Sequence, residues 1–342
     1  MLRRHLLGLV GIIANPAASK DIRRLVAQGR VVPDWEKVNT VRRVMLGLQA
    51  VGVERVVAMP DSSNLVMRAA DDPSVFIKPE FLDMPTFYSE GDTVKASGLM
   101  AGQGVDSLVT LGGDGTNRAV VVGSKSIPMV AISTGTNNVF PTMVEGTLAG
   151  LAAGMVAEDW FELPDVSVPS KIMHVYVDGE LRDIALIDVA LSKERFVASK
   201  AIWDMETLFE VFLTRAEPAS IGLSSIGARL EAVSMRDEGG LQYSIADPDE
   251  YDSETFSVLA PVAPGVVPRV RIASWKRMWD GKRMAVDKRN CTVALDGERA
   301  FSINEYQLLE LEVKRNGPPV IDVNLALNVA AKQGLFNQAL GN

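Results

Sequence analysis

Two polar loops in the first half of the chain constrain its fold more than any other feature. Each follows a short apolar run: Gly112-Gly113-Asp114-Gly115-Thr116 follows 107–111, and Ser133-Thr134-Gly135-Thr136-Asn137-Asn138 follows 128–132. The second loop begins 21 residues after Gly112, which leaves room for one helix and one strand. This spacing is typical of a βαβ unit, so both loops are expected at the carboxyl ends of parallel strands.

Strand and helix patterns alternate over residues 1–160. Apolar runs over 7–14, 53–59, 107–111 and 128–132 predict strands. Helices are predicted over 40–51, within 86–103, after the first loop through 122, and over 142–157. Because this alternation indicates a parallel sheet covered by helices on both faces, residues 1–160 are predicted to form an α/β domain.

The pattern changes after residue 160. Short alternating runs then predict strands over 172–177, 185–191, 228–235, 255–259, 267–273, 290–295 and 308–313. Asp178-Gly179 between two such runs is a strong hairpin signal. Residues 161–320 are predicted to form an antiparallel, sandwich-like β domain. The helical pattern over 322–336 predicts that 321–342 form a C-terminal helix, a candidate to pack back on the first domain.

Composition excludes several classes of function. The 342 residues carry 35 Lys and Arg against 43 Asp and Glu, and no basic run is dense enough to follow a phosphate backbone, so a nucleic-acid partner is not expected. One cysteine and two histidines provide too few ligands for a zinc site and few candidates for a histidine-dependent hydrolase. No apolar run reaches the length of a membrane span.

The start of the chain allows two interpretations. Met1 to Ala14 combines basic residues with an apolar run, which is the pattern of a secretory leader. The apolar run is equally typical of a buried first strand. The helical pattern that follows favours the strand. The single cysteine, Cys291, indicates a reducing compartment, and a cytoplasmic location is expected.

The two loops together predict a phosphate-binding site. Glycine-rich turns between a strand and a helix let backbone N–H groups approach an anion, although the same glycines could serve only to make tight turns. No P-loop lysine is present, and Arg118 occupies the position of the third glycine of a dinucleotide-binding motif. An aspartate within such a loop repels phosphate unless it binds a metal ion or accepts a proton, and both roles fit phosphoryl transfer by Asp114.

Gly112 to Thr116 resembles the signature of the superfamily that joins ATP–NAD kinases with diacylglycerol- and sphingosine-type lipid kinases. Within it, Gly135 to Pro141 and the opening Gly11 to Pro16 are most similar to the acetoin-catabolism protein X branch. The resemblance covers nearly the whole chain. It implies a phosphofructokinase-like α/β domain followed by a β-rich domain, which is the order predicted above.

The resemblance also implies roles for individual residues. Asp114 matches the aspartate that activates the acceptor hydroxyl, ATP is the expected phosphoryl donor with Mg²⁺, and NAD is the expected acceptor. The metal ligands are left unassigned. The predicted binding residues are Gly112, Gly113, Gly115, Thr116, Asn117, Thr134, Gly135, Thr136, Asn137, Asn138, Asp188, Ser224 and Ser225.

The chain departs from both kinase types. NAD kinases carry an Asn-Glu pair after the hairpin, where this chain has Ile187-Asp188. Lipid kinases have Asn-Glu after the first motif, where this chain has Arg118-Ala119. Three functions therefore stay open. The first is a kinase acting on NAD or a related small molecule, for which the resemblance alone implies a link to acetoin catabolism. The others are a non-catalytic NAD- or ATP-binding regulator and a lipid kinase. A homodimer or tetramer is expected by analogy.

Overall fold

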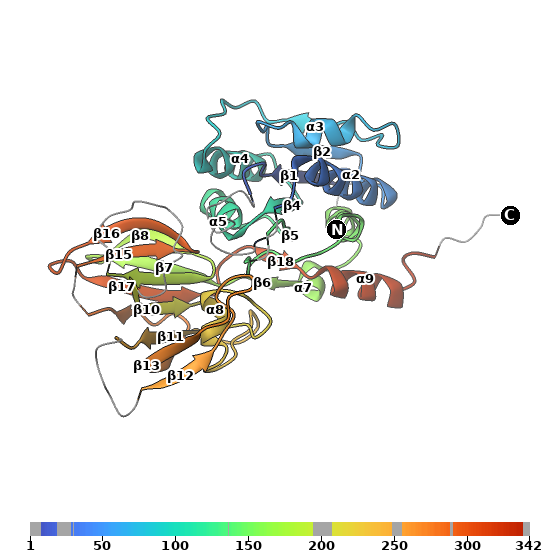
Figure 1. Ribbon diagram of the computed structural model, residues 1–342. Coiled ribbons are helices and arrows are strands. Elements are labelled where there is room, and N and C mark those ends of the chain that lie inside the picture. The colour runs from blue at the N-terminus through green and yellow to red at the C-terminus, as the bar shows by residue number, and fades with distance from the viewer. Residues whose placement is uncertain are drawn as a thin grey trace.

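The computed structural model describes residues 8–18, 29, 31–135, 137–193, 207–247, 255–287 and 290–337. An α/β part contains a seven-stranded sheet in the order β3-β2-β1-β4-β5-β18-β6 (Figure 1). All neighbours in this sheet are parallel except β18 and β6. Its strands are β1 (Leu9–Ala14), β2 (Arg55–Ala58), β3 (Glu80–Phe81), β4 (Ser107–Gly112), β5 (Met129–Ser133), β6 (Ser167–Pro169) and β18 (Pro319–Ile321).

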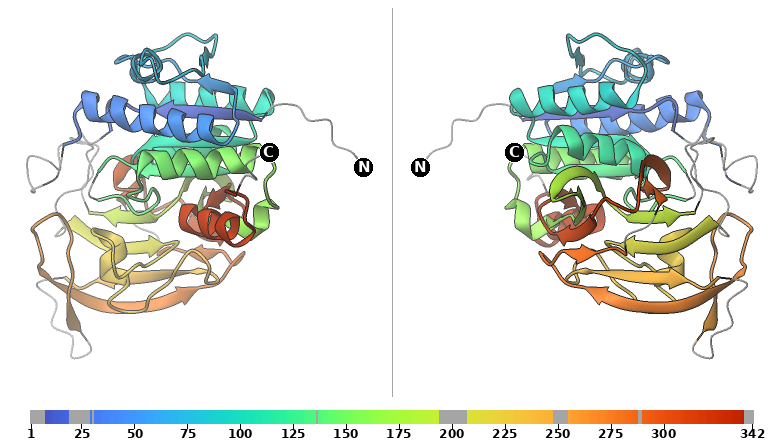
Figure 2. Two further views of the ribbon diagram at one scale, coloured as in Figure 1. Left: turned by 90° about the vertical axis from the view of Figure 1, so that its right-hand side faces the viewer. Right: turned by 90° about the vertical axis from the view of Figure 1, so that its left-hand side faces the viewer.

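Helices cover both faces of this sheet, as the alternating pattern predicted (Figure 2). One face packs against α2 (Asp34–Ala50), α3 (Leu65–Ala70), α6 (Gly146–Ala157) and α9 (Val323–Lys332), which share one apolar core. The other face packs against α4 (Glu90–Gly102) and α5 (Asp114–Gly123). The short helix α7 (Leu163–Val166) leads into β6. Within the described residues, no helix has the length and apolar composition that crossing a membrane requires.

The β-rich part consists of two antiparallel sheets. The larger has the order β12-β13-β11-β10-β9-β15-β16 and the smaller has the order β14-β17-β7-β8. Side chains from both sheets form one buried cluster, so the sheets pack face to face. The elements are β7 (Ile172–Val177), β8 (Glu180–Ala185), β9 (Asp188–Ser192), β10 (Leu208–Leu213), α8 (Leu223–Gly227), β11 (Gly240–Ile245), β12 (Phe256–Leu259), β13 (Arg269–Met278), β14 (Met284–Ala285), β15 (Cys291–Leu295), β16 (Glu298–Ile303) and β17 (Leu309–Lys314).

Two strand predictions were wrong. The strand expected over 185–191 is interrupted at Leu186 and Ile187, because the amides there bind a side chain instead of a neighbouring strand. The strand expected over 228–235 is absent from these residues; α8 ends at Gly227, turns follow, and Val233 alone forms a bridge, with Ala216. The apolar residues of this segment still pack on the core, which explains their alternating pattern.

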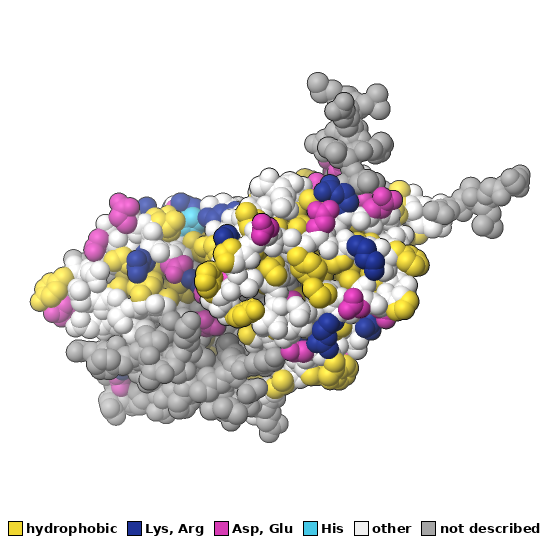
Figure 3. Space-filling model, turned by 90° about the horizontal axis from the view of Figure 1, so that it is seen from above, with side chains coloured by type: hydrophobic (Ala, Val, Ile, Leu, Met, Phe, Trp, Pro, Cys, Tyr) yellow, Lys and Arg dark blue, Asp and Glu magenta, His cyan; other side chains and the backbone are white. Residues whose placement is uncertain are grey.

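The edge of the first sheet that faces away from the β-rich part carries exposed aromatic side chains. Phe76 and Phe87 are each about three-quarters exposed, and Tyr88 is 71% exposed. Figure 3, seen from above this edge, shows hydrophobic side chains interspersed with charged ones. Tyr88 also has a positive φ of 56°, which is uncommon for a bulky residue.

The close crossing of α2 and α6 gives a test of the fold. A Cβ at Gly150 would collide with the backbone carbonyl of Val44 in α2, so Gly150→Ala must push the two helices apart. We expect this overpacking to lower the free energy of unfolding by about 1–3 kcal/mol, measured by urea denaturation. Gly98→Ala in α4 is the control, since its Cβ would make only an ordinary 3.6 Å contact and should stabilise the helix by up to about 1 kcal/mol. Equal stability of the two variants would contradict this packing.

Candidate functional site

The two glycine-containing loops leave the same edge of the first sheet. Strands β4 and β5 pair in parallel, with Gly112 opposite Ser133, the last residue of each strand. The loops therefore begin side by side, as their spacing predicted. Gly113 then caps α5, and Asp114 is its first residue. Because the first N–H groups of a helix have no partner within it, this end of α5 favours an anion.

The side chain of Asn138 lies against both loops. Its Nδ2 donates to Ser133 Oγ at 2.8 Å. A Cβ at Gly113 would lie 3.0 Å from Asn138 Oδ1, and a Cβ at Gly135 would lie 3.0 Å from Asn138 Nδ2. A larger residue at either glycine would thus displace the amide. The two glycines are therefore needed for this close approach of the amide.

The carboxylate of Asp114 binds backbone amides of the second loop. Val139 N donates to both of its oxygens at 3.1 Å, and Phe140 N donates to Oδ1 at 2.8 Å. These contacts hold the aspartate in a fixed position at the start of α5. They also explain why a carboxylate is tolerated in an anion-binding loop, because the amide donors stabilise its negative charge.

Arg215, just after β10, holds the same segment from the other side. Its Nη2 donates to Val139 O at 2.9 Å, and its guanidinium lies over the ring of Phe140, 5.4 Å from the centroid. Glu217 pairs with Arg215 at 3.3 Å. Burial lowers the pKa of Arg215, although the nearby carboxylates counteract this effect. The β-rich part therefore contributes directly to the shape of the second loop.

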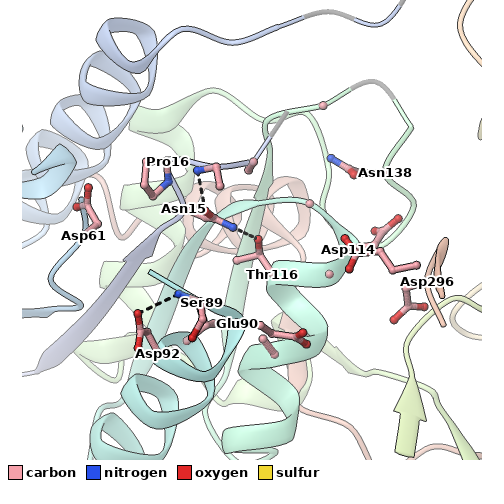
Figure 4. A pocket seen from close by; sticks show the side chains of 18 of the residues that line it. Asn15, Pro16, Asp61, Ser89, Glu90, Asp92, Asp114, Thr116, Asn138 and Asp296 are labelled. Atoms are coloured by element: carbon pink, nitrogen blue, oxygen red, sulfur yellow. Dashed lines mark hydrogen bonds between the residues drawn. The ribbon is translucent and has the colours of Figure 1, made fainter. Parts of the chain in front are cut away.

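A second carboxylate, Asp296, lies close to Asp114 (Figure 4). It occupies the turn after β15 with a φ of 49° and is 6% exposed. Its oxygens accept hydrogen bonds from the amides of Leu186, Ile187 and Asp188, at 2.7 to 3.2 Å. Burial above all, together with the charge of Asp114, raises the pKa of Asp296 to about 7. Asp296 can therefore exchange a proton near neutral pH.

Both carboxylates line a cavity of about 650 Å³. Figure 4 shows Asp114 and Asp296 at one end of it and Asp61 at the other. The walls come from the loops after β1, β2, β4 and β5, from the start of α4, and from the turn after β15. The polar side chains that line it belong to Asn15, Asp61, Ser62, Tyr88, Ser89, Glu90, Asp92, Thr93, Asp114, Thr116, Asn137, Asn138, Asp296 and Glu298.

The lining of this cavity is strongly acidic. It includes six carboxylate residues, and no lysine or arginine occurs among its described lining residues. A polyphosphate would be repelled here unless a cation accompanied it. No group of three or more His, Cys, Asp or Glu suited to hold a metal ion occurs in the described part of the chain. Carboxylates and phosphate oxygens can share Mg²⁺, so the donor set fits a metal ion that enters with a nucleotide.

The structure brings about half of the predicted site residues to this cavity. Lining residues among them are Gly113, Asp114, Gly115, Thr116, Gly135, Asn137 and Asn138. Thr134 instead lines a separate cavity of about 310 Å³. Asp188 and Ser224 line a smaller one of about 70 Å³, together with Asp114 and Asp296.

Three of the other predicted residues lie outside these cavities. Gly112 ends β4 without lining the cavity. Asn117 is fully buried. Its Oδ1 accepts a hydrogen bond from Thr110 Oγ1 and its Nδ2 donates to Gly113 O, so its side chain supports the first loop from within the core. Ser225 donates to backbone carbonyls of its own segment and of Pro261. Thr136 lies outside the described residues.

Several lining residues were not among the predicted ones. Asn15 follows β1 and Asp61 follows β2, so the rule that ligands bind at the carboxyl ends of parallel strands could have identified both. Asp296 and Glu298 belong to the Asp-Gly turn between β15 and β16, a pattern that indicates a hairpin but carries no signal of a binding site. Glu90 and Asp92, at the start of α4, carried no sequence signal beyond helix capping.

Both parts of the chain match models of known protein families. Residues 10–160 match the family model of the ATP-NAD kinase N-terminal domain, and residues 171–316 match that of the acetoin catabolism protein X C-terminal domain. A proposed diacylglycerol kinase from Bacillus anthracis str. Sterne has a TM-score of 0.45 at 14% identity, over 93% of this chain and 98% of that one.

A curated relative covers almost the entire chain. The acetoin catabolism protein X of Cupriavidus necator is 37% identical over 339 residues, which is 96% of this chain and 94% of the relative. The chain therefore belongs to the NAD kinase-like family, in the acetoin catabolism protein X branch.

Proposed function

We propose that this protein is an ATP-dependent kinase that transfers a phosphoryl group to a hydroxyl of a small molecule, NAD or a related compound. The observation that carries this proposal is the convergence of Asp114 and Asp296 at the start of α5, inside a 650 Å³ cavity. An anion-binding helix end, beside a carboxylate that can accept the hydroxyl proton, meets the two needs of phosphoryl transfer to an alcohol.

In this proposal the phosphates of ATP lie against the start of α5 and the second loop. Thr116 and Asn138 provide side-chain donors, and backbone N–H groups of the first turn of α5 complete the contact. Mg²⁺ bound with the nucleotide would offset the charge of the phosphates and of the cavity carboxylates. The acceptor oxygen attacks the terminal phosphorus, its proton passes to Asp114, and ADP leaves.

Asp296 adjusts the charge around this proton transfer. Both carboxylates accept backbone amides, but Asp296 is buried whereas Asp114 is partly exposed at the start of α5, so we assign proton uptake to Asp114 and an electrostatic role to Asp296. When Asp296 is ionised, its charge makes a neighbouring carboxylate a stronger base. When it is protonated, the cavity repels phosphate less.

The surroundings of Asp188 favour a compact acceptor over NAD. Ile187, at the position where NAD kinases have the asparagine of their Asn-Glu pair, is 1% exposed and packs in the core. Asp188 and Ser224 line a cavity of only about 70 Å³, whereas small-molecule sites usually measure about 300–1,000 Å³. An adenosine group is too large for this space, so NAD would need the cavity to open.

One observation favours the alternative of a regulatory nucleotide-binding protein. The contacts of Asp114 with Val139 and Phe140 give this aspartate a structural role that needs no catalysis. A protein that keeps the loops to sense NAD or ATP would retain the same contacts.

Replacement of Asp114 separates these functions. Asp114→Asn keeps an oxygen for the amides of the second loop but cannot take up a proton. We expect ADP release to fall by about 10²-fold or more, with little change in the affinity for Mg²⁺–ATP measured by calorimetry. The control is Asp178→Asn, since the Asp178 carboxylate also accepts a hydrogen bond from a backbone amide, that of Leu308, away from the cavity.

The acceptor is identified in the same assay. NAD, NADH and other hydroxylated small molecules are offered to the wild-type protein, and NADP formation is measured separately. Binding of Mg²⁺–ATP with no turnover on any acceptor would favour the regulator. Phosphoryl transfer to dispersed diacylglycerol, absent with NAD, would favour the lipid kinase.

The raised pKa of Asp296 predicts a pH dependence of stability. Between its ordinary value of 3.8 and about 7, the folded protein holds a proton that the unfolded chain has released. This contribution to the free energy of unfolding is fully present below pH 3.8 and is lost as the pH rises through about 7. The slope is at most about 1.4 kcal/mol per pH unit. Urea unfolding across this range should show the slope in the wild type and not in Asp296→Asn; parallel curves would contradict it.

A further inference from the structure

Lys37, in the first turn of α2, is fully buried, with 0% of its surface exposed. Its ammonium donates to Pro16 O at 2.7 Å and Ala18 O at 2.8 Å, and it lies 3.4 Å from Asn15 O. The carboxylate of Asp34 is 3.9 Å away. A buried charge is costly unless hydrogen bonds compensate it, so these carbonyls and the ammonium depend on each other.

The carbonyls that Lys37 binds belong to a wall of the nucleotide cavity. Residues 15–18 form the loop after β1, and all four line the 650 Å³ cavity. Within this loop, Asn15 Oδ1 accepts from Ala17 N, and Asn15 Nδ2 donates to Thr116 Oγ1, both at 2.9 Å (Figure 4). Lys37 is therefore connected through one loop to the first glycine-containing loop.

Lys37 also lines the second cavity, of about 310 Å³. This cavity lies between α2 and the second loop, and its walls include Thr40, Arg43 and Thr134. The side chain thus lies between two cavities, and its ammonium binds the wall of the first. A small amine entering the second cavity could reach the same carbonyls.

We propose that Lys37 is a positioning residue of the nucleotide site, whose ammonium holds loop 15–18 in the shape that receives the nucleotide. The proposal rests on the nucleotide-binding function proposed above. Removal of the ammonium leaves the carbonyls without this donor, and the loop can turn them toward the cavity. Because Lys37 does not contact the reacting groups, its loss should weaken nucleotide binding more than it slows turnover at saturation.

The chain contains a matched control for this lysine. Lys171 is 2% exposed, and its ammonium also donates to three backbone carbonyls, those of Thr214, Ser234 and Gly239, at 2.8 to 3.2 Å. None of these residues lines the 650 Å³ cavity. Lys171→Met therefore removes an equivalent buried ammonium from carbonyls that do not line the cavity.

The first test compares Lys37→Met and Lys171→Met with the wild type by calorimetric titration of Mg²⁺–ATP at neutral pH. We expect both variants to lose thermal stability, and only Lys37→Met to bind Mg²⁺–ATP at least about tenfold more weakly. If the wild type binds no nucleotide, the proposed function fails and this inference fails with it. If the wild type binds and Lys37→Met binds equally well, the inference alone is wrong.

The second test separates positioning from general destabilisation. In Lys37→Ala, propylammonium supplies the missing carbons and the ammonium group. We expect it at millimolar concentration to restore most of the affinity for Mg²⁺–ATP, whereas tetramethylammonium, which has no N–H donor, should restore none. Failure of propylammonium to exceed tetramethylammonium would overturn the positioning role and leave Lys37 a residue of folding stability only.

Discussion

The arrangement of the site depends on one interaction, the binding of the backbone amides of Val139 and Phe140 by the carboxylate of Asp114. It connects the first turn of α5 to the second loop, although the two segments are 25 residues apart in the sequence. Arg215 of the β-rich part binds the carbonyl of Val139, so the same peptide segment is held from both sides. Asp114 is thus held in one position at the N-terminus of α5, as a role in phosphoryl transfer requires.

A second long-range contact accounts for the way the two parts of the chain meet. Asp296 binds three consecutive amides, at Leu186, Ile187 and Asp188, about 110 residues away. Leu186 and Ile187 belong to neither strand, and the chain bends there between β8 and β9. The bend brings Asp188 to the small cavity and places Ile187 in the core beside Val120 of α5 and Phe140 of the second loop. The buried carboxylate of Asp296 therefore shapes the backbone between β8 and β9 and also contributes to the charge of the site.

The sequence was informative wherever a local pattern determines structure. The buried runs that end in polar loops predicted the parallel sheet and its ligand-binding edge, because a central strand is apolar on both faces. The interruption at Leu186 could not be predicted, since its cause is the distant Asp296. Strands β6 and β18 could not be predicted either, because each has only three residues and shows no periodicity, although both belong to the first sheet. For the site, loop membership identified Asp114 and Asn138 but could not tell that Thr134 faces a different cavity from Asn137.

The position of Ile187 bears on what the site recognises. NAD kinases have the asparagine of their Asn-Glu pair at this position. In this chain the side chain of Ile187 packs in the core between the two parts of the molecule. Asp188 remains as a carboxylate at the edge of a small cavity, next to Asn137 and Ser224. A carboxylate recognises hydroxyl and amine donors but cannot donate to the ring nitrogens of a base. The loops therefore provide groups suited to bind phosphate, while the position of Ile187 provides none suited to bind adenosine, and this supports the proposal of an acceptor more compact than NAD.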